Sequence, residues 1–307
     1  MDNINGVVVV NKPQNWTSHD CVAVVRRVIG VKRVGHTGTL DPMATGVLPV
    51  CVGTAARINE YLDYDTKTYD CVMKLGIITD TLDIWGEVLE ERPVPDMDEA
   101  VIAETIMGFT GEISQIPPKY SALKVAGKKL YEYARAGQEV EIKPRKINIK
   151  YISVNNIDLE NKEISFTVEC SKGTYIRSLC ADIGEKLGCG ACMSGLVRTK
   201  TGVFTLDDAV DIETVKKMSR EELVSKLFPT DYPLVKFGRV ELSANRAKDF
   251  VNGKKIPKRD LAIVRESSRD GFYNVYFNDT FLGVAKLIKG VLSAHKVFDV
   301  RMQNVSI

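Results

Sequence analysis

The 307-residue sequence predicts an α+β protein: a mixed, largely antiparallel sheet flanked by helices, followed by a small β-rich domain. Strand-like and helix-like segments are interspersed without strict β–α–β alternation, which argues against an all-parallel sheet. Residues 146–154 and 163–170 alternate apolar and polar side chains around the turn-rich segment 155–161, as two antiparallel strands would. Two prolines in residues 228–233 precede a run of short strands. We therefore expect domains at residues 1–232 and 233–307.

The composition is that of an ordinary soluble globular protein. Hydrophobic residues make up 44% of the chain and charged residues 27%, which excludes disordered and low-complexity classes. No apolar run approaches the roughly 20 residues that a membrane-spanning helix requires. The first residues show no basic region followed by an apolar one, as a secretory signal would. We expect a cytoplasmic protein without membrane association, and a monomer by default.

The first elements follow from local signals. Residues 7–10 are four valines, which indicate a buried strand that stops at Pro13. Thr17 or Ser18 can cap a following helix, and Gly30 can end it. Residues 35–46 contain three glycines and a proline, which favour an irregular loop.

The remaining elements are predicted from periodicity and from helix-ending glycines. The expected helices are residues 98–109, 128–136, 173–187 and 243–251. Apart from the antiparallel pair, the expected strands are residues 69–75, a segment around Leu261, and residues 273–277, 281–288 and 297–300.

Cysteine and histidine spacing gives no metal site. Cys189 and Cys192 form a C-x-x-C pair, but there is no second pair, and the three histidines do not cluster. The seven scattered cysteines therefore indicate reduced, mostly buried thiols.

The net charge of +2 conceals an uneven distribution. Residues 119–150 contain nine basic and three acidic residues, and residues 236–259 contain eight and two. Residues 81–115 contain nine acidic residues and one basic residue. Basic segments of this kind can hold a polyanion on one face, although many such segments are simply solvated.

The loop at residues 35–46 contains one imidazole, His36, and one carboxylate, Asp41. Three interpretations are open: a nest of backbone amides for an anion, a nucleophile or general base at Asp41, or a turn in which Asp41 only bonds backbone amides. The spacing matches neither the nucleotide-binding P-loop nor the dinucleotide-binding glycine pattern.

Six motifs in order resemble the TruB family of bacterial tRNA pseudouridine-55 synthases. They read GVVVVNKP, GHTGTLDPMATGVLP, KTY, GIITDTLD, PPKYSALKVAGKKLYEYARAG and CSKGTYIRSL, and they span most of residues 4–200. The resemblance implies an enzyme that detaches a uracil of the tRNA T-arm stem-loop, rotates it and rejoins it through carbon 5. It implies no cofactor, no metal and no obligatory protein partner.

The resemblance assigns catalytic roles to three residues. Asp41 is the expected nucleophile, and Arg177 is expected to pair with it, because a buried carboxylate needs a counter-charge. Tyr69 is expected to stack on the extruded base. Whether Asp41 attacks the sugar or accepts a proton stays open.

The same resemblance suggests residues that contact RNA or support the site. His36 is expected to act in RNA binding and base flipping rather than in bond breaking. Lys12 either supports the loop or contacts RNA, and Leu196 packs on the flipped uracil. The family pattern begins Leu-Arg-Arg where this chain has Leu196-Val197-Arg198, which puts one contact in doubt.

Residues 119–150 resemble the RNA-facing insertion of the family, with Lys128 and Lys129 among its cations. Tyr175, in the motif that contains Arg177, is a further expected RNA contact. The end of the chain resembles, more loosely, a PUA-like RNA-binding domain.

Three other functions are less consistent with the sequence. An RNA-binding protein without catalysis would have lost Asp41, Tyr69 or Arg177, and all three are present. A small-molecule hydrolase with an aspartate nucleophile leaves the basic segments unexplained. A homologue guided by a separate RNA and accessory proteins fits poorly with the insertion at residues 119–150.

Overall fold

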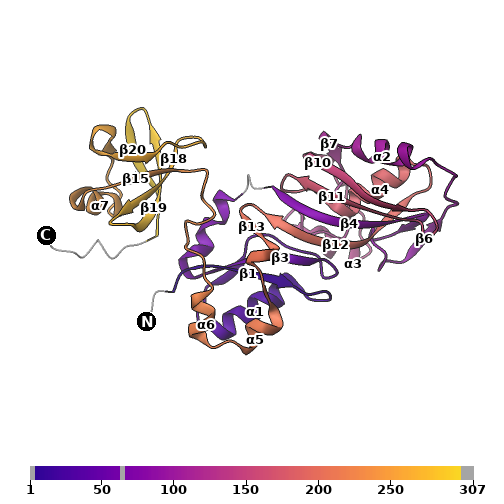
Figure 1. Ribbon diagram of the computed structural model, residues 1–307, viewed down its shortest axis with the longest axis horizontal. Coiled ribbons are helices and arrows are strands. Elements are labelled where there is room, and N and C mark those ends of the chain that lie inside the picture. Colours follow the sequence, from indigo (N-terminus) through magenta and orange to yellow (C-terminus); the bar gives the residue numbers. More distant parts are fainter. Residues whose placement is uncertain (1–3, 63–65, 299–307) are drawn as a thin grey trace.

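A computed structural model describes residues 4–62 and 66–298. The chain forms a larger body around a long curved sheet and a smaller β-rich body at the C-terminal end (Figure 1). The expected α+β architecture is confirmed. Among the described residues, no helix is both long enough and apolar enough to span a bilayer.

The main sheet has ten strands. Its central path runs in the order β14-β1-β3-β12-β4-β11-β10-β7, with β2 paired to β3 and β13 paired to β12. The β1/β14 and β3/β12 pairs are parallel and the other pairs are antiparallel, so the sheet is mixed and largely antiparallel. The strands are β1 (Gly6–Lys12), β2 (Val34–His36), β3 (Thr45–Val52), β4 (Lys67–Leu75), β7 (Gly111–Gln115), β10 (Arg145–Asp158), β11 (Glu163–Cys170), β12 (Ala191–Thr201), β13 (Phe204–Thr205) and β14 (Val210–Asp211).

Helices cover this sheet at its two ends (Figure 1). Near β1 and β3 lie α1 (Ser18–Ile29), α5 (Ile212–Lys217) and α6 (Arg220–Ser225), whereas α2 (Glu99–Met107) and α4 (Ile176–Lys186) pack near β10 and β12. The helix α1 begins as expected, with a capping box between Thr17 and Asp20, and ends at Gly30 in the left-handed conformation. The valines of β1 alternate between the two faces of the sheet, and Val8 and Val10 pack in the core on the α1 face.

Smaller elements complete the larger body. They are the 3-10 helices η1 (Gly53–Tyr61) and η2 (Leu206–Asp208), the hairpin of β5 (Ile77–Thr79) and β6 (Val88–Glu91), the hairpin of β8 (Lys124–Val125) and β9 (Lys128–Lys129), and α3 (Leu130–Arg135). The predicted insertion at residues 119–150 therefore consists of the β8–β9 hairpin, α3 and the beginning of β10.

The sequence prediction missed six strands of the main sheet, which are β2, β3, β7, β12, β13 and β14. The strand β12 lies between β3 and β4, and register shifts next to Gly195 and Lys200 interrupt its alternation. A strand that is covered on both sides and bulged shows no simple period of two. The predicted loop at 35–46 also starts in β2 and ends in β3, and β10 continues four residues past the predicted strand end at 154.

The smaller domain is a six-stranded sheet in the order β16-β20-β19-β18-β15-β17, with α7 packed on it. Its elements are β15 (Gly238–Glu241), α7 (Ala244–Val251), β16 (Ile256–Pro257), η3 (Lys258–Asp260), β17 (Ala262–Arg265), β18 (Phe272–Phe277), β19 (Thr280–Ile288) and β20 (Val291–Val297). The last strand was predicted at 297–300. It ends at Val297 instead, and residues 299 and 300 lie outside the described residues.

A hydrophobic cluster joins the two bodies. Val7 and Val9, on the β1 face opposite α1, pack with Tyr61, Phe237 and other apolar residues in one buried core that also includes Val284 of the smaller domain. The backbone of Phe228 still pairs with Val7, at N–O distances of 2.9 and 2.8 Å. The chain therefore leaves the main sheet after Phe228 and enters the smaller one at Gly238.

Phe237 is the residue of this cluster whose loss we expect to matter most, because its ring is 1% exposed and stacks on Phe272 at 5.1 Å. Phe237→Ala should lower the free energy of unfolding by about 3–5 kcal/mol, the usual cost of deleting a buried ring. Urea denaturation measures this. The control Val264→Ala removes a side chain that is 63% exposed and should cost less than about 0.5 kcal/mol. If Phe237→Ala and Val264→Ala lowered the free energy of unfolding by equal, small amounts, this would contradict a core shared by the two bodies.

Candidate active site

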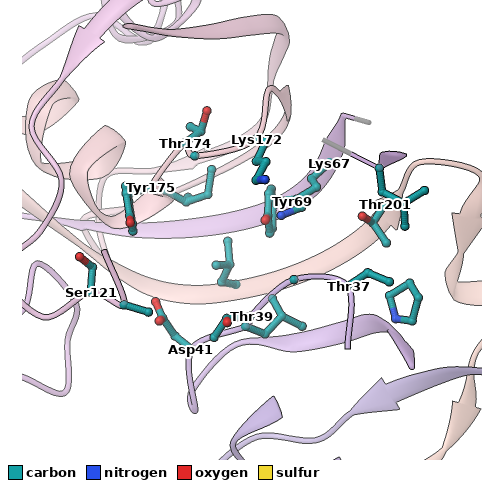
Figure 2. A pocket seen from close by; sticks show the side chains of 18 of the residues that line it. Thr37, Thr39, Asp41, Lys67, Tyr69, Ser121, Lys172, Thr174, Tyr175 and Thr201 are labelled. Carbon is teal, nitrogen blue, oxygen red and sulfur yellow. The ribbon is translucent and has the colours of Figure 1, made fainter. Parts of the chain in front are cut away.

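A cavity of about 400 Å³ opens between the loop after β2, the strands β4 and β12, the start of α4 and the insertion. Asp41, Tyr69, Tyr175, Arg177 and Leu196, which the sequence singled out, all line it. Thr37, Thr39 and Asp41 face the cavity from the loop, and Tyr69, Lys67 and Lys172 face it from the opposite side (Figure 2).

The expected ion pair between Asp41 and Arg177 is present. Arg177 Nε lies 2.9 Å from Asp41 Oδ2, and the side chains are 6% and 41% exposed respectively. Two backbone carbonyls hold the same guanidinium: Nη1 donates to Thr81 O at 3.0 Å and Nη2 to Tyr120 O at 2.8 Å. The two carbonyls thus hold the arginine in place, and the carboxylate of Asp41 remains accessible from the cavity.

A second carboxylate shares this arginine. Asp83 Oδ2 lies 3.5 Å from Arg177 Nη1, and Asp83 Oδ1 accepts from Thr81 Oγ1 at 2.8 Å. Burial raises the pKa of Asp83, although Thr81 and Arg177 oppose that rise. Asp83 belongs to the motif GIITDTLD, but the sequence assigns it no role, because nothing local links it to residue 177.

Lys12 lies beneath the loop. Its side chain is fully buried, and Nζ donates to the carbonyls of Pro13, Trp16 and Pro42 at 2.9, 2.7 and 2.9 Å. Of the two roles that the sequence left open for Lys12, these contacts favour support of the loop immediately after Asp41. Burial lowers the pKa of Lys12 to about 8.

Ser18, which the sequence analysis considered only as a helix cap, holds the residue before Asp41. Its Oγ accepts from Leu40 N at 2.9 Å and donates to Leu40 O at 3.2 Å. Thr17 is the actual cap of α1. One turn of α1 is thereby fastened to the loop.

Tyr69 and Leu196 come from adjacent strands of the sheet. Tyr69 on β4 is 7% exposed, and Leu196 on β12 is half-buried. Burial raises the pKa of the Tyr69 hydroxyl, while the nearby positive charge of Arg198 opposes the rise. At neutral pH the hydroxyl therefore keeps its proton.

His36 is close to the cavity but does not line it. Its ring lies 5.1 Å from that of His19, its Nδ1 is buried without a hydrogen-bond partner, and its backbone carbonyl accepts from Asn59 Nδ2 at 3.2 Å. Burial, together with His19 and the cations Arg198 and Lys67, lowers the pKa of His36 to about 4. The imidazole is neutral at pH 7 and is not placed as a general base beside Asp41.

Lys128 and Lys129 are not brought into the cavity. They form β9 in the hairpin of the insertion, where their ammonium groups lie 5.9 and 5.3 Å from the ring centres of Tyr133 and Tyr131. Tyr175 caps α4, and its backbone exchanges two hydrogen bonds with the Gln115 side chain, at 2.8 and 3.0 Å.

The cysteines are buried and free, as expected from their scatter. Within residues 4–62 and 66–298, no group of three or more histidine, cysteine or acidic side chains is arranged to hold a metal ion.

Solved structures share this fold. A chain in a crystal structure of a Cbf5–Nop10–Gar1 complex superposes with a TM-score of 0.74, at 24% identity, covering 97% of this chain and 86% of that one. A family model of the TruB family pseudouridylate synthase N-terminal domain matches residues 26–176, and one of the tRNA pseudouridylate synthase B C-terminal domain matches residues 177–235. The fold and site thus define a pseudouridine synthase, an enzyme that isomerises uridine.

Curated relatives make the assignment more specific. Proteins named tRNA pseudouridine synthase B are 43% identical over 286 residues in Clostridium tetani and 46% identical over 296 residues in Ralstonia nicotianae. These alignments cover 93% and 96% of this chain, and 96% and 94% of the relatives. The chain belongs to the TruB family of pseudouridylate synthases.

Lys12 gives a prediction on pH and stability. Its folded-state pKa of about 8 lies below the ordinary value of 10.5, so between those values the unfolded chain binds more protons. Stability from this group therefore rises with pH across that window. From about pH 7.5 to about pH 9.5, the free energy of unfolding should rise by about 2 kcal/mol more in the native protein than in Lys12→Met.

Urea denaturation of both proteins at the two pH values measures the difference, and the variant cancels the contributions of all other groups. Parallel pH profiles would show that Lys12 titrates normally and is not desolvated beneath the loop.

Proposed function

We propose that this chain converts uridine 55 in the T-loop of tRNA to pseudouridine, with Asp41 as the nucleophile and without a cofactor. The observation that supports this best is the Asp41–Arg177 pair: a carboxylate fixed by a buried arginine, with 41% of its side chain exposed at a cavity. Relatives that align with almost the whole chain are named tRNA pseudouridine synthase B.

The reaction suits these groups. Uridine and pseudouridine are isomers: the bond from ribose carbon 1′ to uracil nitrogen 1 breaks and a bond to carbon 5 forms, carbon 5 loses its proton, and nitrogen 1 gains a proton. No electrons or groups are gained overall, so the chemistry requires no co-substrate. An aspartate is ionised at neutral pH and can attack the sugar or accept a proton from it without prior activation. Arg177 keeps its charge at any working pH.

The cavity fits an extruded base. Its volume of about 400 Å³ lies within the usual range for small-ligand sites. Tyr69 and Leu196 provide an aromatic ring and an apolar side chain for the two faces of a uracil. Stacking of this kind contributes roughly 1–3 kcal/mol per base and offsets part of the cost of unstacking.

The charge of the cavity favours a polyanion. Lys67, Arg145, Lys172 and Arg177 line it, and Asp41 is the only acidic residue among the described residues that do. Phosphate groups on both sides of an extruded uridine would meet these cations. Tyr175 in the cavity wall, together with His36, Lys128 and Lys129 outside the cavity, completes the proposed contact surface for the T-arm. The proposal includes a monomer that acts in the cytoplasm without an obligatory protein partner.

Asp41→Asn should abolish isomerisation, because the amide is neither a nucleophile nor a base, whereas His36→Ala should retain measurable activity. A tRNA transcript with tritium at carbon 5 of its uridines releases tritium when the new bond forms. The native protein should release about one equivalent, which maps to position 55. A His36→Ala protein as inactive as Asp41→Asn, with normal RNA affinity, would contradict the assignment of His36 to RNA binding, and an active Asp41→Asn protein would contradict the assignment of Asp41.

Replacing Lys128 or Lys129 by Gln should weaken tRNA binding and reduce the slope of log K against log salt by about one per lost phosphate contact. Filter binding at several salt concentrations measures the slope. Lys217→Gln, an exposed lysine on α5, serves as the control and should leave the slope unchanged. An unchanged slope in the hairpin variants would remove Lys128 and Lys129 from the interface.

A further inference from the structure

Arg198 is a fully buried cation that the mechanism above does not use. It lies on β12, where it is the register partner of Tyr69 on β4 and of Gly46 on β3. It therefore lies between the strand that contains Tyr69 and the strand that follows the Asp41 loop.

The guanidinium of Arg198 reaches three backbone carbonyls. Nε donates to Val47 O at 2.8 Å, Nη2 to Gly38 O at 3.2 Å and Nη1 to Thr39 O at 3.4 Å. Two of these acceptors lie in the loop just before Asp41, and the third is on β3 just after it. A lysine has one ammonium and cannot span three acceptors in different directions, whereas the arginine fork can.

Arg198, Lys12, Ser18 and the Ala44 amide together bind every carbonyl of residues 38–42. Arg198 binds those of Gly38 and Thr39, Ser18 that of Leu40, the Ala44 amide that of Asp41, and Lys12 that of Pro42. A glycine-rich loop has many accessible backbone conformations, so its geometry depends on such contacts. The two buried cations fix the loop on each side of Asp41.

Gly46 makes this close arrangement possible. Its φ is +102°, and a Cβ there would lie 2.3 Å from the backbone oxygen of Arg198. Glycine thus lets β3 approach β12 closely enough for the arginine side chain to pass beneath the loop.

The other side of Arg198 faces Tyr69. Arg198 and Tyr69 lie opposite each other in adjacent strands, where Cβ atoms are about 4.5–5.5 Å apart, and the positive charge of Arg198 acts on the Tyr69 hydroxyl. Arg198 thus binds the loop that presents Asp41 and is the strand neighbour of the ring that lines the opposite side of the cavity.

We infer that Arg198 is a positioning residue that sets the separation between Asp41 and Tyr69, and with it the room in which the uracil turns. This inference rests on the proposed function. Side chains alternate along a strand, so Arg198 lies on the same face of β12 as Leu196, which lines the cavity, and Val197 lies on the other face and takes no part in this contact.

The test measures tritium release from a carbon 5-labelled tRNA transcript in single turnover, with saturating enzyme, for Arg198→Met and Arg198→Lys. Filter binding gives the tRNA affinity, and thermal melting confirms that each variant is folded. Lys200→Met, an exposed cation on the same strand, is the matched control. We expect Arg198→Met to react about 100-fold more slowly and Arg198→Lys about 10-fold more slowly, with the Kd for tRNA within about twofold of native.

A folded Arg198→Lys protein with the native single-turnover rate would overturn the inference, because Arg198 would then be only structural. A Kd for tRNA that rises about 10-fold or more, together with a native rate at saturating enzyme, would also overturn the inference. Arg198 would then be an RNA-binding residue. If Arg198→Met does not fold, Arg198→Lys decides by the same criteria. If the native protein itself releases no tritium, the proposed function fails, which is a separate outcome.

Discussion

The ion pair between Asp41 and Arg177 is the interaction on which the rest of the site depends. It joins a loop near the start of the chain to the first turn of α4, far along the sequence, and both halves need support that they cannot supply themselves. Arg177 is immobilised by the carbonyls of Thr81 and Tyr120 and by Asp83. Because a buried arginine with fixed partners cannot follow a moving carboxylate, the loop that presents Asp41 must be equally well fixed.

That requirement explains the two buried cations beneath the loop. Lys12 and Arg198 are fully buried, and they donate hydrogen bonds to backbone carbonyls. Desolvation makes this arrangement costly, as the lowered pKa of Lys12 shows. Lys12 and Arg198 bind the backbone of the loop, and the Asp41 carboxylate pairs with Arg177, so the carboxylate can act on substrate while its backbone stays in place.

Much of the site was predictable from motifs, and the parts that were not share a physical cause. Asp41, Tyr69 and Arg177 were identified as a group, and the structure places all three around one cavity. Arg198 and Asp83 were given no role from the sequence, because a charged residue is expected on the surface by default. Whether it is buried depends on partners far away in the chain. For Lys12 the sequence left two roles open, and only the surrounding carbonyls of Trp16 and Pro42 distinguish them.

The sequence alone determined the elements that local chemistry encodes. The Thr17 cap and Gly30 stop define α1, and the alternation at residues 163–170 defines β11 with the observed bounds. Only the tertiary structure decided where β12 lies, because a central strand with two bulges is stabilised by neighbours on both sides rather than by its own pattern. The same strand turns Arg198 inward, towards the loop and Tyr69. Residue types thus indicate the chemistry, and long-range strand pairing sets the geometry in which that chemistry can occur.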